Sequence, residues 1–184
     1  MRIPKVKLKI NLDELFGGSY QYGESTKEAL GQAIIDKIVE RTQEQRVDKF
    51  GKKLAGYSKA YANSLDGQVG GKIQGQPANL TLSGDMLSSI NIIEKTAKTI
   101  TIGFDDDTEN AKAFGHISGM EGHPTIKKGK VRDFFGLPKS ELRMIADEFK
   151  PDIEAISQVK TTKERSKFEQ KILDAIKALE GENG

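Results

Sequence analysis

Histidine has the widest chemical repertoire of any side chain near neutral pH, and the two histidines of this sequence lie close together. His116 and His123 flank a glycine-containing segment with one carboxylate, Glu121. These groups are good zinc ligands, but a glycine-rich loop does not hold ligands in a fixed geometry, and the spacing does not match the helical zinc-protease motifs. Ser118 is one residue away from the central position that a nucleophile elbow requires. We therefore expect no metal site here, and a small hydrolase that uses either histidine is the least favoured hypothesis.

An acidic run begins at Asp105 and invites comparison with the calcium-binding loop of EF-hands. The sixth position of that loop would be Asn110 instead of glycine, and the twelfth would be His116 instead of a bidentate glutamate. Carboxylates are also favoured at the start of a helix, where backbone N–H groups are unpaired. We therefore predict that the acidic run begins a helix through Ala111 and Ala113.

A polar, glycine-rich stretch covers residues 66–77, and it fails the test for a phosphate-binding P-loop. The first glycine of that motif would fall at Asp66, and Lys72 is followed by Ile73 instead of serine or threonine. We expect instead a loop that becomes ordered against a partner. Because no cofactor fingerprint and no nucleophile–base pair remains, we predict that the protein is not an enzyme and needs no cofactor.

The densest basic cluster consists of Lys127, Lys128, Lys130 and Arg132. It directly precedes two phenylalanines that must be buried, so it is either a solvated approach to a core element or an interface. Clusters of lysine and arginine bind phosphate groups, which supports an alternative hypothesis of a nucleic-acid-binding module. The net charge of +2 is too small to require such a partner.

The composition is that of an ordinary globular protein: of 184 residues, 36% are hydrophobic and 30% are charged. This length corresponds to one domain, or to one domain with an extension. Because there is no cysteine, disulfides and thiolate metal sites are excluded. No apolar run reaches the length of a membrane span, and the N-terminus lacks the apolar core of a signal peptide, so we expect assembly in a cytoplasm without a membrane partner.

Hydrophobic periodicity predicts an α+β fold with a small antiparallel sheet. Apolar residues alternate with lysines over residues 6–12, as in a half-buried strand, and residues 90–93 and 100–104 predict a hairpin. An apolar stripe predicts a long N-terminal helix over residues 25–47 that covers the sheet. A short or kinked helix is expected within residues 50–64.

The C-terminal part of the chain is predicted to be helical. Pro138 suits the first turn of a helix that should end before Pro151, which divides the chain into a domain of residues 1–150 and an extension of residues 151–184. A last amphipathic helix has a narrow apolar stripe flanked by charges. We expect this stripe to dock in a groove of a partner or an adjacent subunit, with packing on its own sheet as the alternative; it contains Phe168, Ile172 and Ile176.

The segment from Asn79 to Ile90 is predicted to be the structural joint around which the other elements are arranged. Leu80 and Leu82 alternate with a threonine, as in a short strand, and Ser83 is a good helix N-cap. Apolar residues then recur at helical spacing up to Ile90. Nothing in the segment can perform chemistry, so we interpret it as structural.

This joint resembles a signature of the virion-morphogenesis, or tail-completion, proteins of tailed bacteriophages. The signature runs Leu-Thr-x-(Ser/Thr)-Gly-x-(Leu/Met)-x-x-Ser-(Ile/Leu), and it corresponds here to Leu80, Thr81, Leu82, Ser83, Gly84, Met86, Leu87 and Ser89. The block that follows it in the same family is similar to Arg132, Asp133, Phe134, Phe135 and Gly136. The order and the spacing of the two blocks both fit.

The resemblance implies a structural virion protein at the head–tail junction, or neck, of a phage. Such a protein forms a homo-oligomeric ring, expected to be a hexamer, around the channel for DNA. Its implied partners are other neck and tail proteins, together with DNA that passes without sequence-specific contacts. The candidate interface residues are Lys127, Lys128, Lys130, Phe168, Ile172 and Ile176.

The second block makes a finer prediction about two adjacent aromatic residues. If Phe134 and Phe135 lie on a strand, their side chains point to opposite faces. One should then fill the core, while the other packs against a helix or a neighbouring chain.

Overall fold

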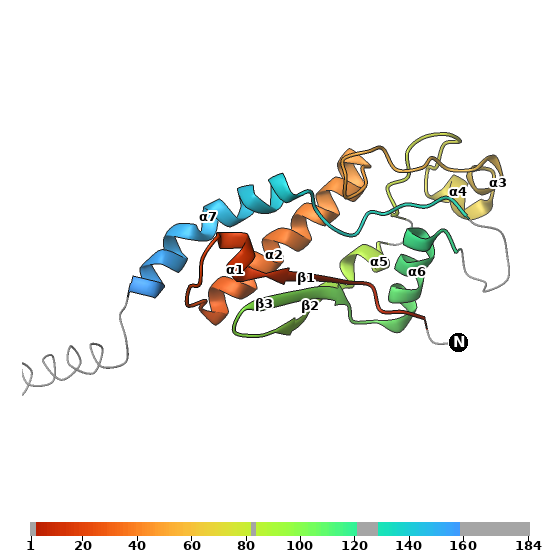
Figure 1. Cartoon of the computed structure of the whole chain (residues 1–184). Helices are drawn as coiled ribbons and strands as arrows, with labels where there is room; N and C mark the ends of the chain where they lie inside the picture. Colours follow the sequence, from red (N-terminus) through yellow and green to blue (C-terminus); the bar gives the residue numbers. More distant parts are fainter. Residues whose placement is uncertain (1–2, 82–83, 121–128, 159–184) are drawn as a thin grey trace, which may run out of the picture.

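A computed structural model describes residues 3–81, 84–120 and 129–158 of the chain. Its centre is a three-stranded antiparallel sheet in the order β1-β3-β2, formed by β1 (Lys7–Asn11), β2 (Ile90–Lys95) and β3 (Thr99–Phe104) (Figure 1). The α+β class and the antiparallel sheet predicted from the sequence are confirmed. The predicted hairpin corresponds to β2 and β3, which pair with a register shift between Ile92 and Glu94.

The central strand β3 has the most buried sequence of the sheet. Ile100 pairs with Ile10 of β1, and Ile102 pairs with Leu8, so apolar side chains line up across the sheet. The two lysines of β1, Lys7 and Lys9, remain exposed. The alternation in the sequence therefore predicted correctly which face of β1 is turned to the core.

Helix α2 (Glu24–Glu40) packs on the sheet, as the apolar stripe predicted (Figure 1). Its side chains Leu30, Ile34 and Ile38 are buried. Gly31 lets the helix approach closely, because a Cβ placed there would lie 2.4 Å from Ile92 Cδ1 of β2. The helix continues into a short π-helical turn, η1 (Arg41–Gln45), in which Arg41 and Thr42 are buried.

Two helices pack beside α2 at the start and the end of the described chain. The short α1 (Leu12–Phe16), which the sequence analysis did not predict, begins at an Asn11 cap and buries Leu12 and Phe16. Helix α7 (Lys139–Gln158) contacts both α1 and α2 and runs back along α2 (Figure 1). The predicted stop before Pro151 is wrong: although a proline removes one backbone hydrogen bond, α7 continues through it. The expected domain boundary between residues 150 and 151 therefore falls inside one helix.

Residues 56–77, called here the α3–α4 lobe, form a separate layer at the end of α2 (Figure 1). They contain two short helices, α3 (Lys59–Ala62) and α4 (Leu65–Val69), and α3 is the short helix expected within residues 50–64, although it covers only four residues of that range. Each helix begins at a serine whose side chain accepts a backbone N–H. The lobe is closed by isolated bridges between Gly56 and Pro77 and between Tyr57 and Gln74.

The central segment differs from its prediction at its first residues. Leu80 has φ 52° and lies outside any strand, so the strand expected at residues 80–82 is absent in the described part. Helix α5 (Asp85–Ser88) follows as predicted, but Gly84, with φ 92°, occupies the cap position that was assigned to Ser83. Leu82 and Ser83 lie outside the described residues. Helix α6 (Asp107–Ser118) then begins at the acidic run, as predicted.

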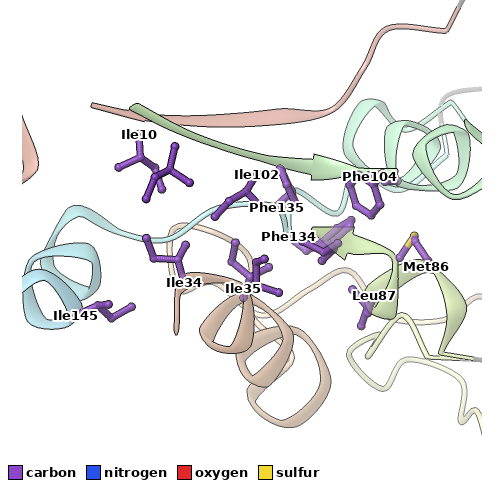
Figure 2. Packing of buried hydrophobic residues seen from close by; sticks show 14 of the residues in the cluster. Ile10, Ile34, Ile35, Met86, Leu87, Ile102, Phe104, Phe134, Phe135 and Ile145 are labelled. Atoms are coloured by element: carbon purple, nitrogen blue, oxygen red, sulfur yellow. The ribbon is translucent and has the colours of Figure 1, made fainter. Parts of the chain in front are cut away.

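The core lies between the sheet and α2, and α5, α7 and the segment 132–137 extend it (Figure 2). The prediction that only one of Phe134 and Phe135 fills the core is wrong. The segment around them is not a strand, and both side chains are buried in the same cluster, with 2% and 6% of their surface exposed. Without strand geometry, adjacent residues have no reason to point to opposite faces.

Candidate functional site

The two signature blocks, which are far apart in the sequence, meet in one core. Met86 and Leu87 from α5 belong to the same buried cluster as Phe134 and Phe135 (Figure 2). The rings of Phe104 and Phe135 lie 5.2 Å apart, and those of Phe134 and Phe135 meet edge to face at 6.2 Å. Such ring pairs add to the stabilisation from apolar burial. Residues of both blocks therefore belong to the same core, and the second block packs against the end of β3.

The first block is held by hydrogen bonds as well as by apolar packing. The Thr81 hydroxyl donates to the Asn79 carbonyl at 3.0 Å, and Ser89 Oγ donates to the Met86 carbonyl at 2.9 Å. Lys72 from the α3–α4 lobe reaches Asn79 Oδ1 at 2.9 Å and also donates to the Thr81 carbonyl. These polar residues of the signature thus fix the chain path into α5.

The polar residues of the second block clamp three segments together. Arg132, with 7% of its surface exposed, donates from Nε to the Ala55 carbonyl at 3.0 Å, and its backbone N–H donates to the His116 carbonyl at 2.8 Å. Asp133 forms an ion pair of 2.8 Å with Lys49. Gly136 has φ 142°, a conformation that side-chain-bearing residues rarely adopt. Arg132 was expected in a basic surface cluster, but it is a buried structural side chain.

His116 also has a different setting from the one predicted. It lies in the last turn of α6 instead of a glycine-rich loop, and its Nδ1 is 3.4 Å from Arg132 Nη1. His123 and Glu121 lie outside the described residues. Within the part of the chain that the structure describes, no group of three or more metal-ligating side chains could hold a metal ion.

The described half of the basic cluster faces the α3–α4 lobe. Lys130 donates to the Gly56 carbonyl at 2.7 Å and lines a hollow of about 380 Å³ together with Arg132 and the two tyrosines of the lobe. The Tyr57 and Tyr61 rings stack at 5.4 Å, and Tyr57 is buried with its hydroxyl bonded to Asn79. Because Lys130, Arg132 and Tyr57 already bond to other parts of the same chain, we interpret the hollow as part of the contact between the α3–α4 lobe and the rest of the molecule. Lys127 and Lys128 lie outside the described residues.

The carboxylates of the acidic run have structural partners. Asp106 caps α6, and the backbone N–H of Glu109, followed by that of Thr108, holds the pKa of the Asp106 carboxyl below its usual value. Asp105 accepts from Asn91 at 2.7 Å, and Asp107 pairs with Lys5. The helix-start interpretation of the run is confirmed.

Two surface features were missed by the sequence analysis. On α4, Leu65 and Val69 lie one helical turn apart and are 77% and 80% exposed. The sequence did not indicate this apolar face, because its many glycines predict a loop. The second feature is an open groove of about 490 Å³ between α2 and α7. Its lining residues are Ala33, Asp36, Lys37, Glu40, Glu141, Met144, Ile145 and Glu148.

The groove could not have been found from the sequence, since it depends on how α7 packs against α2. The apolar signal at its wall, an exposed Met144 beside the buried Ile145, becomes visible only in the folded chain. The remaining candidate interface residues, Phe168, Ile172 and Ile176, lie outside the described residues. No helix in the described part of the chain has the length and apolar character needed to cross a membrane.

Comparison with known proteins gave no match: no family model, no curated protein and no solved structure is significantly similar to this chain. The likeness of the two sequence blocks to phage tail-completion proteins therefore stays a prediction.

Proposed function

We propose that this protein is a structural virion protein of a tailed phage, a neck or tail-completion subunit that forms a ring around the DNA channel. The observation that supports the proposal is the meeting of the two signature blocks in one buried cluster around Phe104, Phe134 and Phe135. Apolar residues of both blocks, among them Met86, Leu87 and Phe134, are buried, as expected of a signature that maintains a fold. In this proposal the protein acts through assembly and has no catalytic residue, cofactor or metal.

The exposed apolar residues of α4 are consistent with a subunit that assembles. Leu65 and Val69 lie on the same side of a short helix, and Ile73, which follows it, is 63% exposed. Contiguous exposed apolar side chains often mark a surface that binds another protein. In a closed ring, each copy would bury such a surface against its neighbour.

The alternative, a nucleic-acid-binding module, has weaker support. The side chains of Lys130 and Arg132 donate hydrogen bonds to the carbonyls of Gly56 and Ala55. The buried Tyr57 ring is already stacked on the Tyr61 ring. A single-strand-binding platform needs free aromatic faces beside its cations.

Sedimentation equilibrium combined with DNA titration tests the two functions against each other. The proposal expects one discrete ring mass, a small multiple of 20.3 kDa, with DNA binding that is weak and independent of sequence. A monomer that binds DNA with an affinity falling steeply as salt rises would favour the alternative. As a control, Lys7→Gln on the exposed face of β1 should leave the ring mass unchanged.

A further inference from the structure

The groove between α2 and α7 is strongly acidic. Its lining includes four carboxylates, from Asp36, Glu40, Glu141 and Glu148, against the single lysine Lys37. Lys37 is already paired with Glu40 at 2.7 Å. Among the described residues, no lysine or arginine lies within ion-pair distance of Asp36 or Glu148, so the groove keeps negative charge available for a partner.

One of these carboxylates is only partly satisfied. Glu141 pairs through Oε1 with the buried Arg41, whereas its Oε2 is buried and has no hydrogen-bond partner within the described chain. A buried carboxylate oxygen without a partner is costly unless a donor reaches it. The wall beside it is apolar, since Met144 is 67% exposed and Ile145 packs into the core. The groove thus offers an apolar wall with acidic rims.

The sequence that follows α7 is basic and amphipathic, which complements the acidic groove with its apolar wall. Between residues 160 and 171 there are five basic residues, Lys160, Lys163, Arg165, Lys167 and Lys171, and two acidic ones, Glu164 and Glu169. Its apolar stripe, Phe168, Ile172 and Ile176, has the spacing of one helical face, which is how an amphipathic helix enters a groove.

The placement of α7 favours a neighbouring copy over the same chain. Gln158 lies about 15 Å along the helix beyond Glu148, at a rise of 1.5 Å per residue, and α7 carries the chain away from the groove at that end (Figure 1). Residues 157–166 contain no glycine, proline or asparagine to reverse the chain sharply.

From the acidic groove and the basic, amphipathic segment, we propose that residues 160–179 of one copy dock in the α2–α7 groove of the next copy. The inference rests on the ring assembly proposed above and assigns one of its subunit contacts. The basic side chains of the segment would pair with the rim carboxylates, and its apolar stripe would cover Met144.

Charge reversal on the full chain tests this docking. Asp36→Lys with Glu148→Lys disables the groove, and Lys163→Glu with Lys167→Glu disables the segment. We expect each pair of substitutions to weaken assembly at least about tenfold, measured by sedimentation velocity, because close opposite charges become like charges. Mixing the two variants should restore assembly, because the intact segment of one variant meets the intact groove of the other, and at the next contact the reversed charges of segment and groove are again opposite. Matched controls on exposed surface outside the groove, Glu44→Lys with Asp147→Lys and Lys7→Glu with Lys9→Glu, should assemble normally.

A cross-linking experiment keeps the test valid if a variant folds poorly. The chain has no cysteine, so Met144→Cys and Ile172→Cys can be placed on separate chains and mixed. A disulfide-linked dimer of the two variants is expected, in clear excess over a mixture in which Lys7→Cys replaces Met144→Cys. An assembled wild type with no excess cross-link and no effect of charge reversal would overturn the docking but leave the ring. A wild type that stays monomeric at all concentrations would overturn both.

Discussion

At the scale of single residues, the two signature blocks contribute both buried apolar side chains and polar side chains that hold neighbouring segments by hydrogen bonds. Phe134 and Phe135 fill the core, and Arg132 holds the carbonyl of Ala55 while its backbone binds the end of α6. The sequence indicated that the phenylalanines must be buried, but it could not show that both point inward. That outcome depends on an irregular backbone, which hydrophobic alternation does not describe.

The first prediction concerns these aromatic residues. Phe134→Ala and Phe135→Ala should each lower the free energy of unfolding by about 3–5 kcal/mol, because each removes a buried ring and leaves a cavity. Phe50→Ala is the matched control: its ring is 68% exposed, so the change should be within about 0.5 kcal/mol. Urea unfolding of the three variants measures the difference. A stable Phe135→Ala variant would place that ring outside the core.

The second prediction concerns Tyr22. Burial, followed by its 3.1 Å hydrogen bond to Asp13, raises the pKa of the Tyr22 phenol to about 12. The fold favours the neutral phenol, so this contribution to stability is fully present below the ordinary pKa near 10 and is lost as the pH rises towards 12. Ultraviolet titration of phenolate should show a late component that Tyr22→Phe removes. If the wild-type and variant curves differ only near pH 10, Tyr22 is not shielded in this way.

At the scale of elements, long periodic segments were predictable and short ones were not. The stripe of α2 and the alternation of β1 follow from burial of one face, so the sequence carries them clearly. Helices α1, α3 and α4 have four or five residues each and are fixed by caps such as Asn11 and Ser64, which give little periodic signal. The Pro151 rule failed because a proline inside a helix removes one backbone hydrogen bond and kinks the helix more readily than it ends it.

The third prediction tests how the α3–α4 lobe is closed. In Gly67→Ala, the new Cβ would lie 2.0 Å from the Tyr61 carbonyl oxygen, which is backbone and cannot turn aside. Overpacking of this kind costs about 1–3 kcal/mol, which exceeds the gain of about 0.5–1 kcal/mol from replacing a helical glycine by alanine. Hydrogen exchange should therefore increase within residues 58–76. Gly71→Ala is the control: Gly71 has φ 62° and nothing within 4 Å of an added Cβ, so that variant introduces backbone strain without a clash. Unchanged protection in Gly67→Ala would show that the helices are not in close contact.

At the scale of the whole molecule, the described chain forms one body with two outward features, the apolar face of α4 and the acidic α2–α7 groove. Both depend on tertiary packing, so the sequence predicts contacts in loops and in the C-terminal segment but does not locate these two surfaces. The predicted interface residues Phe168, Ile172 and Ile176 follow the last described helix, in the basic segment that we propose enters the groove.

The fourth prediction separates folding from assembly. A chain that ends after Gln158 keeps every described element, including all of the buried cluster. It should melt cooperatively, with a Tm close to that of the monomeric charge-reversal variants, and should no longer form the ring. Calorimetry and sizing of the truncated chain measure both properties. Loss of the cooperative melt would mean that residues 159–184 belong to the subunit's own core.

Electron microscopy of the purified full chain tests the proposal that this protein is a ring-forming subunit of a phage neck. We predict class averages with a closed ring of cyclic symmetry, six-fold by the resemblance, around a channel wide enough for duplex DNA. Images that contain only single copies or open, non-closing chains at concentrations well above those in an assembling phage would contradict it.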